Sequence, residues 1–122
     1  MTSSTQIPSL TLNDGVEIPQ LGLGVFQVPP EDTFENVTTA FEAGYRHIDT
    51  AKAYENEAGV GQALRASGLD REDVFVTTKL FNSDHGYDSA KAALRRSLDR
   101  LEVEHVDLYL IHWPVPSQDR YV

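Results

Sequence analysis

The chain has 122 residues, 40% of them hydrophobic, and a formal net charge of -9 at pH 7. This length and composition are typical of one small globular domain, or part of one, and exclude a disordered polypeptide. The negative charge argues against nucleic acid and anionic membranes as partners through bulk electrostatics, although it leaves room for a local basic pocket. The sequence has no cysteine, which excludes disulfides, thiolate chemistry and zinc bound by Cys.

The first ten residues contain no basic region followed by an apolar run, and no apolar stretch approaches ~18 residues, the length that a membrane helix needs. We therefore expect a soluble, cytoplasmic protein. Without internal repeats or low-complexity segments to mark a linker, we expect a single domain over residues 1–122.

The first predicted element is a β-hairpin over residues 10–18, where apolar and polar residues alternate around the turn Asp14-Gly15. The apolar run at residues 21–25 is too short for a helix and predicts a strand. Residues 26–30, which end in two prolines, are expected to form a loop.

The first predicted helix follows this loop. Asp32 and Glu35 fit a variant of the capping box, and Gly44 is expected to stop the helix. Residues 45–49 then predict the second strand, and residues 56–68 a second helix that ends at a glycine.

The same alternation continues to the end of the chain. The β-branched run at residues 74–78 predicts a strand, and a helix is expected to begin at Asp88 or Ser89. Residues 106–111 predict the fourth strand, and residues 113–122 a loop. Strands and helices that alternate with short joints predict an α/β fold with a parallel sheet and right-handed crossovers.

Two architectures share this alternation. A doubly wound sheet would be complete at about five strands, whereas a (β/α)8 barrel needs ~250 residues, roughly twice the present length. Composition does not choose between them.

Polar residues end or follow three successive predicted strands: Asp49, Lys79 and His112. The carboxyl ends of parallel strands meet at one edge of the sheet, where α/β folds place their active sites. Tyr54 lies five residues after Asp49, in the loop above the same edge. We expect these four side chains to lie together.

Together the four can protonate a developing alkoxide. A phenol has a pKa of about 10 and is a weak proton donor at neutral pH, but a neighbouring ammonium stabilises its phenolate. Lys79 can supply that ammonium, and Asp49 can keep Lys79 ionised. His112 can donate a hydrogen bond to a substrate oxygen or relay a proton. Because none of the four is a source of electrons, carbonyl reduction here needs hydride from a cofactor.

Several motifs match one family in order and spacing. They are Gly22-Leu-Gly24, then Gly44-Tyr-Arg-His-Ile-Asp-Thr-Ala51 with Tyr54, Asn56-Glu57 and Val60-Gly61, then Thr77-Thr-Lys79 and Leu110-Ile-His-Trp-Pro114. With these motifs the chain resembles the aldo-keto reductases over nearly its whole length from about Leu10. The segment of residues 24–30 is similar to that of the bacterial 2,5-diketo-D-gluconate reductases.

The resemblance implies a (β/α)8 TIM barrel of which this chain is the N-terminal half, with an N-terminal β-hairpin, four parallel strands and three helices. It also implies a catalytic tetrad of Asp49, Tyr54, Lys79 and His112. Tyr54 would be the general acid and Lys79 would favour its phenolate. Asp49 would hold Lys79, and His112 would orient the carbonyl.

The resemblance implies NADPH as the hydride donor and a small-molecule carbonyl compound as the substrate. The residues implied near the nicotinamide are Val25, Phe26 and Asp49. The residues implied to line the substrate pocket are Phe26, Phe81, His112 and Trp113. Phe81 stands where many relatives carry Trp, a difference that affects pocket width and substrate preference. No metal is expected.

In the family, the other half of the barrel, which is absent here, supplies most of the residues that bind the cofactor phosphates and the nicotinamide amide. The resemblance therefore leaves open the physiological substrate and the choice between NADPH and NADH. It also leaves an alternative function, a non-catalytic half-barrel or an interaction protein on the same scaffold. An open half-barrel would expose two parallel edge strands and is expected to self-associate, whereas the complete protein is expected to be a monomer.

Three further features receive structural interpretations. Lys52 is interpreted as solvated surface, and Arg46 and His47 as braces of their strand or of a neighbouring carboxylate. The pair Gly22 and Gly24 does not predict a Rossmann phosphate loop, because no third glycine opens a helix after it.

Overall fold

A computed structural model describes residues 6–121. Residues 1–5, part of the segment judged to lack a targeting signal, and residue 122, the end of the predicted C-terminal loop, lie outside the described part. Two strands, β1 (Ser9–Thr11) and β2 (Glu17–Pro19), form the predicted antiparallel hairpin.

The main sheet has four parallel strands in the order β3-β4-β5-β6. They are β3 (Leu23–Gly24), β4 (His47–Asp49), β5 (Phe75–Leu80) and β6 (Leu108–Ile111). Sequence order and spatial order agree, so each of the first three strands is followed by a crossover to its neighbour. The predicted alternation and the parallel sheet are both confirmed.

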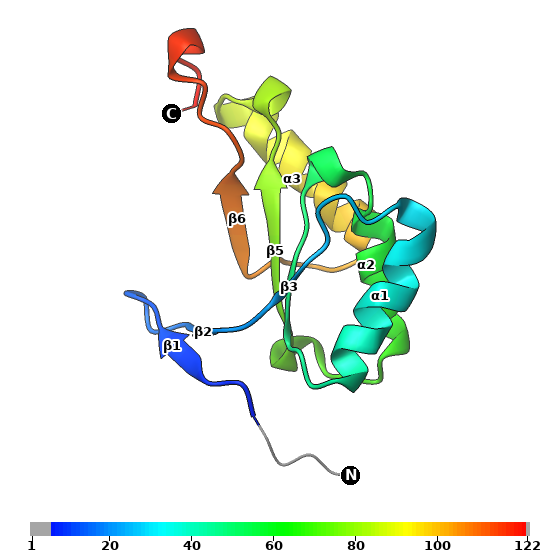
Figure 1. The fold of residues 1–122 in the computed structure, drawn as a ribbon. Helices are drawn as coiled ribbons and strands as arrows, with labels where there is room; N and C mark the ends of the chain where they lie inside the picture. The colour runs from blue at the N-terminus through cyan, green and yellow to red at the C-terminus, as the bar shows by residue number, and fades with distance from the viewer. Residues whose placement is uncertain (1–5, 122) are drawn as a thin grey trace.

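Three helices, α1 (Pro30–Glu42), α2 (Glu57–Ala66) and α3 (Tyr87–Leu101), make these crossovers. They gather on one side of the sheet, and β6 lies at its edge (Figure 1). Within residues 6–121 no helix has the length and apolar character needed to cross a membrane.

The core lies between the sheet and the helices. Its fully buried members include Val25 from the end of β3, Ile48 from β4, Val37 from α1, Val60 from α2 and Leu101 from α3. Because β3, β4, β5 and all three helices contribute to this one cluster, burial of these side chains fixes how the helices pack on the sheet.

The capping box predicted for Asp32 and Glu35 is wrong. Helix α1 begins two residues before Asp32, with Pro29 as the N-cap residue, Pro30 in the first turn and no capping hydrogen bond from a side chain. A proline at the first helical position has no N–H to satisfy and a backbone angle φ already suited to a helix, so no cap is required. The predicted loop is therefore one residue too long, since Pro30 is helical.

Two other predicted boundaries shift slightly. β4 begins at His47, because the N–H of Tyr45 still donates to the carbonyl oxygen of Ala40 in α1. Helix α3 begins at Tyr87, after Gly86 with a backbone angle φ of 114°. Glycine adopts such a positive φ without strain, so the chain turns sharply there.

Helices α2 and α3 touch at Gly61. A Cβ at this position would collide with the backbone carbonyl oxygen of Leu101, at the end of α3. Backbone atoms cannot swing aside as a flexible side chain can, so the close approach of the two helices requires glycine here.

Gly61→Ala should therefore destabilise the chain by roughly 1–3 kcal/mol, as overpacking does. In an ordinary helix interior the same change stabilises by ~1 kcal/mol, so the sign of the effect is diagnostic. Urea unfolding of the 122-residue chain measures it. The control is Gly24→Ala, where an added Cβ meets no atom within 4 Å. An unchanged or raised stability of Gly61→Ala would contradict the close approach.

Candidate active site

The carboxyl ends of the strands bring together side chains that are far apart in the sequence. In the register of the parallel sheet, Gly24 lies beside Asp49, and Lys79 beside Leu110. His112 comes directly after β6, and its backbone N–H donates to the carbonyl oxygen of Leu80. One edge of the sheet therefore carries Asp49, Lys79 and His112.

The Lys79 ammonium is the centre of this group. It donates to the carboxylate of Asp49, to the carbonyl oxygen of Thr50 at 2.9 Å and to the hydroxyl of Tyr54 at 3.3 Å. Three donors are all that an ammonium has, so each of its hydrogens has an acceptor. The Lys79 side chain is only 12% exposed, and the carboxylate compensates its charge.

Tyr54 lies at the end of a short 3₁₀ turn, Lys52–Tyr54, that follows β4. Its ring is nearly perpendicular to the imidazole of His112, with 5.6 Å between the ring centroids, and lies 5.3 Å from the ring of Phe26. Edge-to-face packing of this kind favours one ring orientation. The Tyr54 hydroxyl is thereby directed at the Lys79 ammonium.

His112 lies in surroundings that favour its neutral form. Burial lowers the pKa of its imidazole, the Lys79 ammonium lowers it further, and the Asp49 carboxylate opposes both. Nδ1 is buried and has no hydrogen-bond partner among residues 6–121. At neutral pH His112 is therefore an uncharged imidazole, and Nε2 is the nitrogen that can reach a ligand.

The other residues predicted at the cofactor and the substrate differ in exposure. Phe26 and Trp113 are 65% and 63% exposed, so their rings are open to a ligand. Phe81 is half-buried, and the Lys52 ammonium lies 5.6 Å from the centre of its ring. The Val25 side chain lies wholly in the core, so any contact of this residue with a cofactor would come from its backbone.

The interpretation of Lys52 as solvated surface is wrong. Its ammonium lies 2.7 Å from the carboxylate of Asp84, in the 3₁₀ turn Asn82–Asp84 after β5. The sequence held no signal for this ion pair, because the two residues are 32 positions apart and meet only when the strands align. The pair links the turn that carries Tyr54 to the loop that follows Phe81.

Arg46 and His47 do brace their strand. Arg46 donates to the carbonyl oxygens of Phe41 and Tyr45, and Nε2 of His47 lies 3.1 Å from the hydroxyl oxygen of Thr77 on β5. Both contacts hold β4 against its neighbours. Neither residue lies in the group around Lys79.

Sequence reasoning missed the role of Asn56 and Glu57 at the start of α2. Both side chains are buried. Glu57 accepts hydrogen bonds from Thr78 at 2.6 Å and from Arg100 at 2.7 Å, which joins α2 to β5 and to α3. Asn56 hydrogen-bonds across the loops at the sheet edge. The only available signal was the Asn-Glu pair itself, which has the composition of an ordinary helix start.

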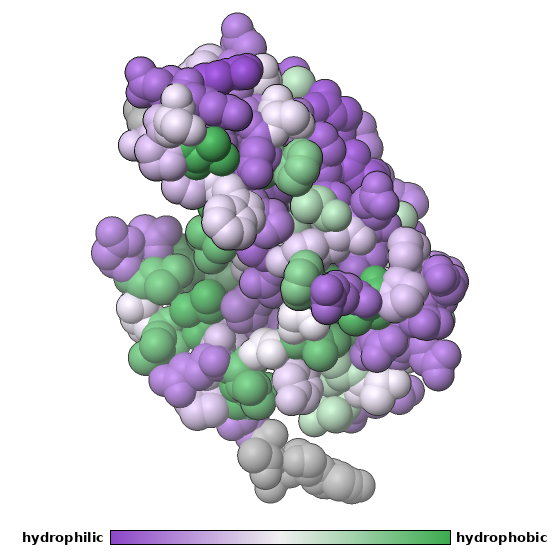
Figure 2. Space-filling model, turned by 45° about the horizontal axis from the view of Figure 1, so that its top comes forward, coloured by the Kyte–Doolittle hydropathy of each residue, from purple (hydrophilic) through white to green (hydrophobic). Residues whose placement is uncertain are grey.

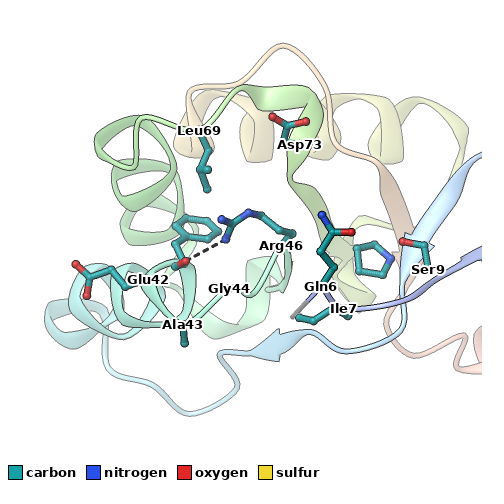
Figure 3. Close-up of a pocket in the computed structure, with 11 residues that line it drawn as sticks. Gln6, Ile7, Ser9, Glu42, Ala43, Gly44, Arg46, Leu69 and Asp73 are labelled. Carbon is teal, nitrogen blue, oxygen red and sulfur yellow. Dashed lines mark hydrogen bonds between the residues drawn. The ribbon is translucent and has the colours of Figure 1, made fainter. Parts of the chain in front are cut away.

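A cavity of about 650 Å³ lies at the opposite, amino-terminal end of the strands (Figure 3). Its lining includes Gln6, Ser9, Glu42, Arg46 and Asp73, and none of the four predicted catalytic residues. The guanidinium of Arg46 is held there by the Phe41 carbonyl oxygen. This cavity is separate from the site around Lys79. Within the described residues, no cluster of three or more His, Asp or Glu could hold a metal.

The chain matches the model of the aldo/keto reductase family over residues 20–121. It belongs to that family. It is 58% identical over 115 residues to an aldo-keto reductase of Mycolicibacterium smegmatis, covering 94% of this chain and 42% of that protein.

Solved structures agree. An aldo/keto reductase of Brucella melitensis is 52% identical with a TM-score of 0.93, covering 98% of this chain and 46% of that one. An aldo-keto reductase of Bombyx mori in complex with NADP is 43% identical with a TM-score of 0.86, covering 91% of this chain and 39% of that one. This aldo-keto reductase chain thus spans less than half the length of these relatives, and its four-stranded sheet is half of their (β/α)8 barrel.

The Lys52–Asp84 pair can be tested by Lys52→Met. The change removes the nearer cation from a carboxylate that is only 13% exposed, leaving Arg96 at 3.6 Å. Unfolding free energy should fall by roughly 1–2 kcal/mol, measured by urea denaturation. The control is Lys91→Met, an exposed lysine beside Tyr87, which should change stability by less than ~0.5 kcal/mol. Equal effects of the two changes would contradict a structural role for the pair.

The electrostatics of the site can be tested by following the titration of His112 by NMR. Removing the ammonium with Lys79→Met should raise the midpoint of His112, and removing the carboxylate with Asp49→Asn should lower it, because the two charges act in opposite directions. His105, before β6 at the other end of the strand, provides a reference signal. Midpoint shifts with the opposite signs would contradict the arrangement of charges.

Proposed function

We propose that this chain supplies the catalytic half of an NADPH-dependent aldo-keto reductase, which reduces an aldehyde or a ketone to an alcohol. One observation carries the proposal. The Lys79 ammonium donates simultaneously to Asp49, to the backbone of Thr50 and to the Tyr54 hydroxyl. A phenol held against an ammonium in a partly buried site is the arrangement that a general acid for alkoxide protonation requires.

In this proposal Tyr54 is the general acid. As the carbonyl carbon of the substrate is reduced, negative charge develops on the carbonyl oxygen, and the Tyr54 hydroxyl donates its proton there. The phenolate that remains is stabilised by the Lys79 ammonium 3.3 Å away. Asp49 pairs with that ammonium and fixes it in position.

His112 orients the substrate. A neutral imidazole carries one N–H, which can donate to the carbonyl oxygen without competing with Tyr54 for the role of acid. Its packing against the Tyr54 ring sets the two donors side by side. Two donors directed at one oxygen stabilise the charge that develops on it during reduction.

NADPH, when bound, supplies the hydride that this chemistry needs. The described residues fit its nicotinamide end. The Phe26 ring is exposed beside Tyr54, and the Asp49 side chain is 39% exposed, so a carboxylate oxygen remains within reach of a polar group on the ring. Phe26, Asp49 and the backbone of Val25 are the groups that would hold it.

The substrate proposed is a small carbonyl compound. Phe26 and Trp113 offer exposed aromatic faces and Phe81 a half-buried one, while His112 supplies the polar contact. Few polar groups on aromatic walls are typical of small-molecule sites. Keto-sugar acids are one candidate class, because the segment of residues 24–30 is similar to that of 2,5-diketo-D-gluconate reductases.

One observation favours the alternative of a non-catalytic interaction protein. Among the described strands β6 pairs only with β5, and Leu110 and Ile111 on it are 39% and 44% exposed. Hydrophobic side chains, coloured green, also gather on part of the face shown in the space-filling view (Figure 2). An open strand edge with apolar side chains can pair with another chain. Catalysis is proposed only for the complete barrel. Fluorescence titration of the 122-residue chain with NADPH is therefore expected to show no saturable binding.

The test of Tyr54 uses a complete barrel, made by fusing this chain to the C-terminal half of the Brucella melitensis protein. Tyr54→Phe removes the proton donor but keeps the ring that packs on His112 and Phe26. Carbonyl turnover should fall ~10²- to 10⁴-fold, the usual contribution of general acid catalysis. Fluorescence titration should show unchanged affinity for NADPH.

The matched control is Tyr87→Phe, which removes the hydroxyl of an exposed tyrosine on α3 and should leave turnover unchanged. Turnover by Tyr54→Phe within a few-fold of the parent would overturn the acid assignment. An unmodified chimera without turnover, when the Brucella protein turns over the same substrate, would overturn the proposed function.

A further inference from the structure

The side chain of Asn56 links the loop after β3 to the end of β4. Its side chain is 1% exposed. Its amide nitrogen donates to the carbonyl oxygens of Val25 at 2.9 Å and Val28 at 3.1 Å, and its amide oxygen accepts from the hydroxyl of Thr50 at 2.7 Å. Both amide hydrogens and the amide oxygen are therefore engaged, with the loop after β3 on one side and the end of β4 on the other.

The loop after β3 is a tight turn in a strained conformation. The N–H of Val28 donates to the carbonyl oxygen of Val25, and Gln27 between them has a backbone angle φ of 66°. A residue with a Cβ adopts such an angle uncommonly and at a cost in free energy, which its surroundings have to offset. Asn56 contributes to that constraint, since its amide binds the carbonyl groups at both ends of the turn.

The turn presents Phe26 to the site. Phe26 lies between Val25 and Gln27, and its exposed ring rests 5.3 Å from the ring of Tyr54. Few other contacts can hold a ring that is 65% exposed, so its place depends on the backbone of the turn.

Through its amide oxygen, Asn56 is connected by way of Thr50 to Lys79. Thr50 donates its hydroxyl to Asn56, and the Thr50 carbonyl oxygen accepts from the Lys79 ammonium. The same residue thus fixes the position of the Phe26 ring above Tyr54 and of a backbone acceptor of the ammonium beside it.

An ordinary helix start would not need these contacts. Asn56 occupies the N-cap position of α2, where an asparagine usually accepts a hydrogen bond from the first turn, yet its side chain makes no such bond. Its three side-chain hydrogen bonds all go to the site loops instead.

We propose that Asn56 is a positioning residue of the reductase site, which holds the strained turn Val25–Val28 so that Phe26 stays over Tyr54. The inference rests on the proposed function for its effect on catalysis, but the position of the ring can be measured without any activity. Asn56 touches neither a reacting atom nor an exposed surface, so its action is through Phe26 and Thr50.

The first experiment measures that position in the 122-residue chain by NMR, as the cross-relaxation between the rings of Phe26 and Tyr54. Asn56→Asp keeps the acceptor for Thr50 but replaces both amide donors with an acceptor. The inter-ring contact should be lost. The matched control is Asn36→Asp, which removes the same kind of amide-to-backbone bond on the exposed face of α1 and should leave the contact intact.

The second experiment measures kcat/KM in the complete-barrel chimera. Asn56→Asp should lower it about tenfold to a hundredfold, the effect of displacing a site group by about 1 Å. If Asn56 acts through Phe26, the double variant with Phe26→Ala should be no slower than Phe26→Ala alone. A general weakening of the fold would instead multiply the two effects.

A third variant covers the case in which Asn56→Asp does not fold. Gln27→Pro lies in the exposed turn and cannot adopt a positive φ, so it should disrupt the turn with Asn56 intact and reproduce the loss of the ring contact. Retention of the contact in Gln27→Pro or in a folded Asn56→Asp, or multiplicative effects in the double variant, would overturn the proposal. An inactive chimera would overturn the proposed function alone, because the ring contact is measured independently.

Discussion

The site depends on one interaction, the burial of the Lys79 ammonium among three acceptors. An ammonium that is 12% exposed is stable only if its charge and its three hydrogens are satisfied. The acceptors come from the end of β4 and from the turn beyond it, while the lysine comes from β5. The parallel register of these two strands therefore has to be correct before the group can form. This requirement couples the geometry of the site to the fold of the sheet.

Two residues at the start of α2 make hydrogen bonds that support the edge of the sheet. Asn56 and Glu57 are adjacent and buried, and they bind opposite partners, the loops of the site for Asn56 and α3 with β5 for Glu57. The charge of the Glu57 carboxylate also affects the pKa of a neighbouring phenol, that of Tyr109. Burial first, and then the charges of Glu57 and Asp84, raise the pKa of Tyr109 on β6 to about 12, so this phenol stays protonated. Thr78 and Tyr109 are paired in the sheet, which places this polar cluster next to Lys79 in sequence.

In the proposed enzyme, proton transfer and enclosure of the reactants depend on different parts of the barrel. The groups proposed for proton transfer lie at the carboxyl ends of β4, β5 and β6 and in the turn after β4. Among the described strands the sheet is open at β6, where Leu110 and Ile111 are exposed, and the relatives that the chain matches are more than twice as long. In the proposal, the barrel closes against this edge and the rest of the cofactor is held there. In the proposal, the geometry for proton transfer is therefore formed by this half, whereas the reactants are enclosed only by the complete barrel.

The sequence by itself determined the order and type of the elements, because hydrophobic periodicity and glycine or proline punctuation act over a few residues. It also placed Asp49, Lys79 and His112 at one edge, since the ends of parallel strands must meet. Boundaries were less well predicted where two local signals competed, as at Pro30, which looked like a loop residue but opens a helix.

Only the tertiary structure decided which polar residues meet across the sheet. Lys52 looked like solvated surface and Asn56 like an ordinary helix start, yet Lys52 binds Asp84 and Asn56 holds the loop before α1. Such partners lie about 30 residues apart in the chain and are adjacent only after the strands align. Sequence patterns of a few residues carry no information on pairs that are about 30 residues apart. The residues that support the site could therefore not be found from the sequence.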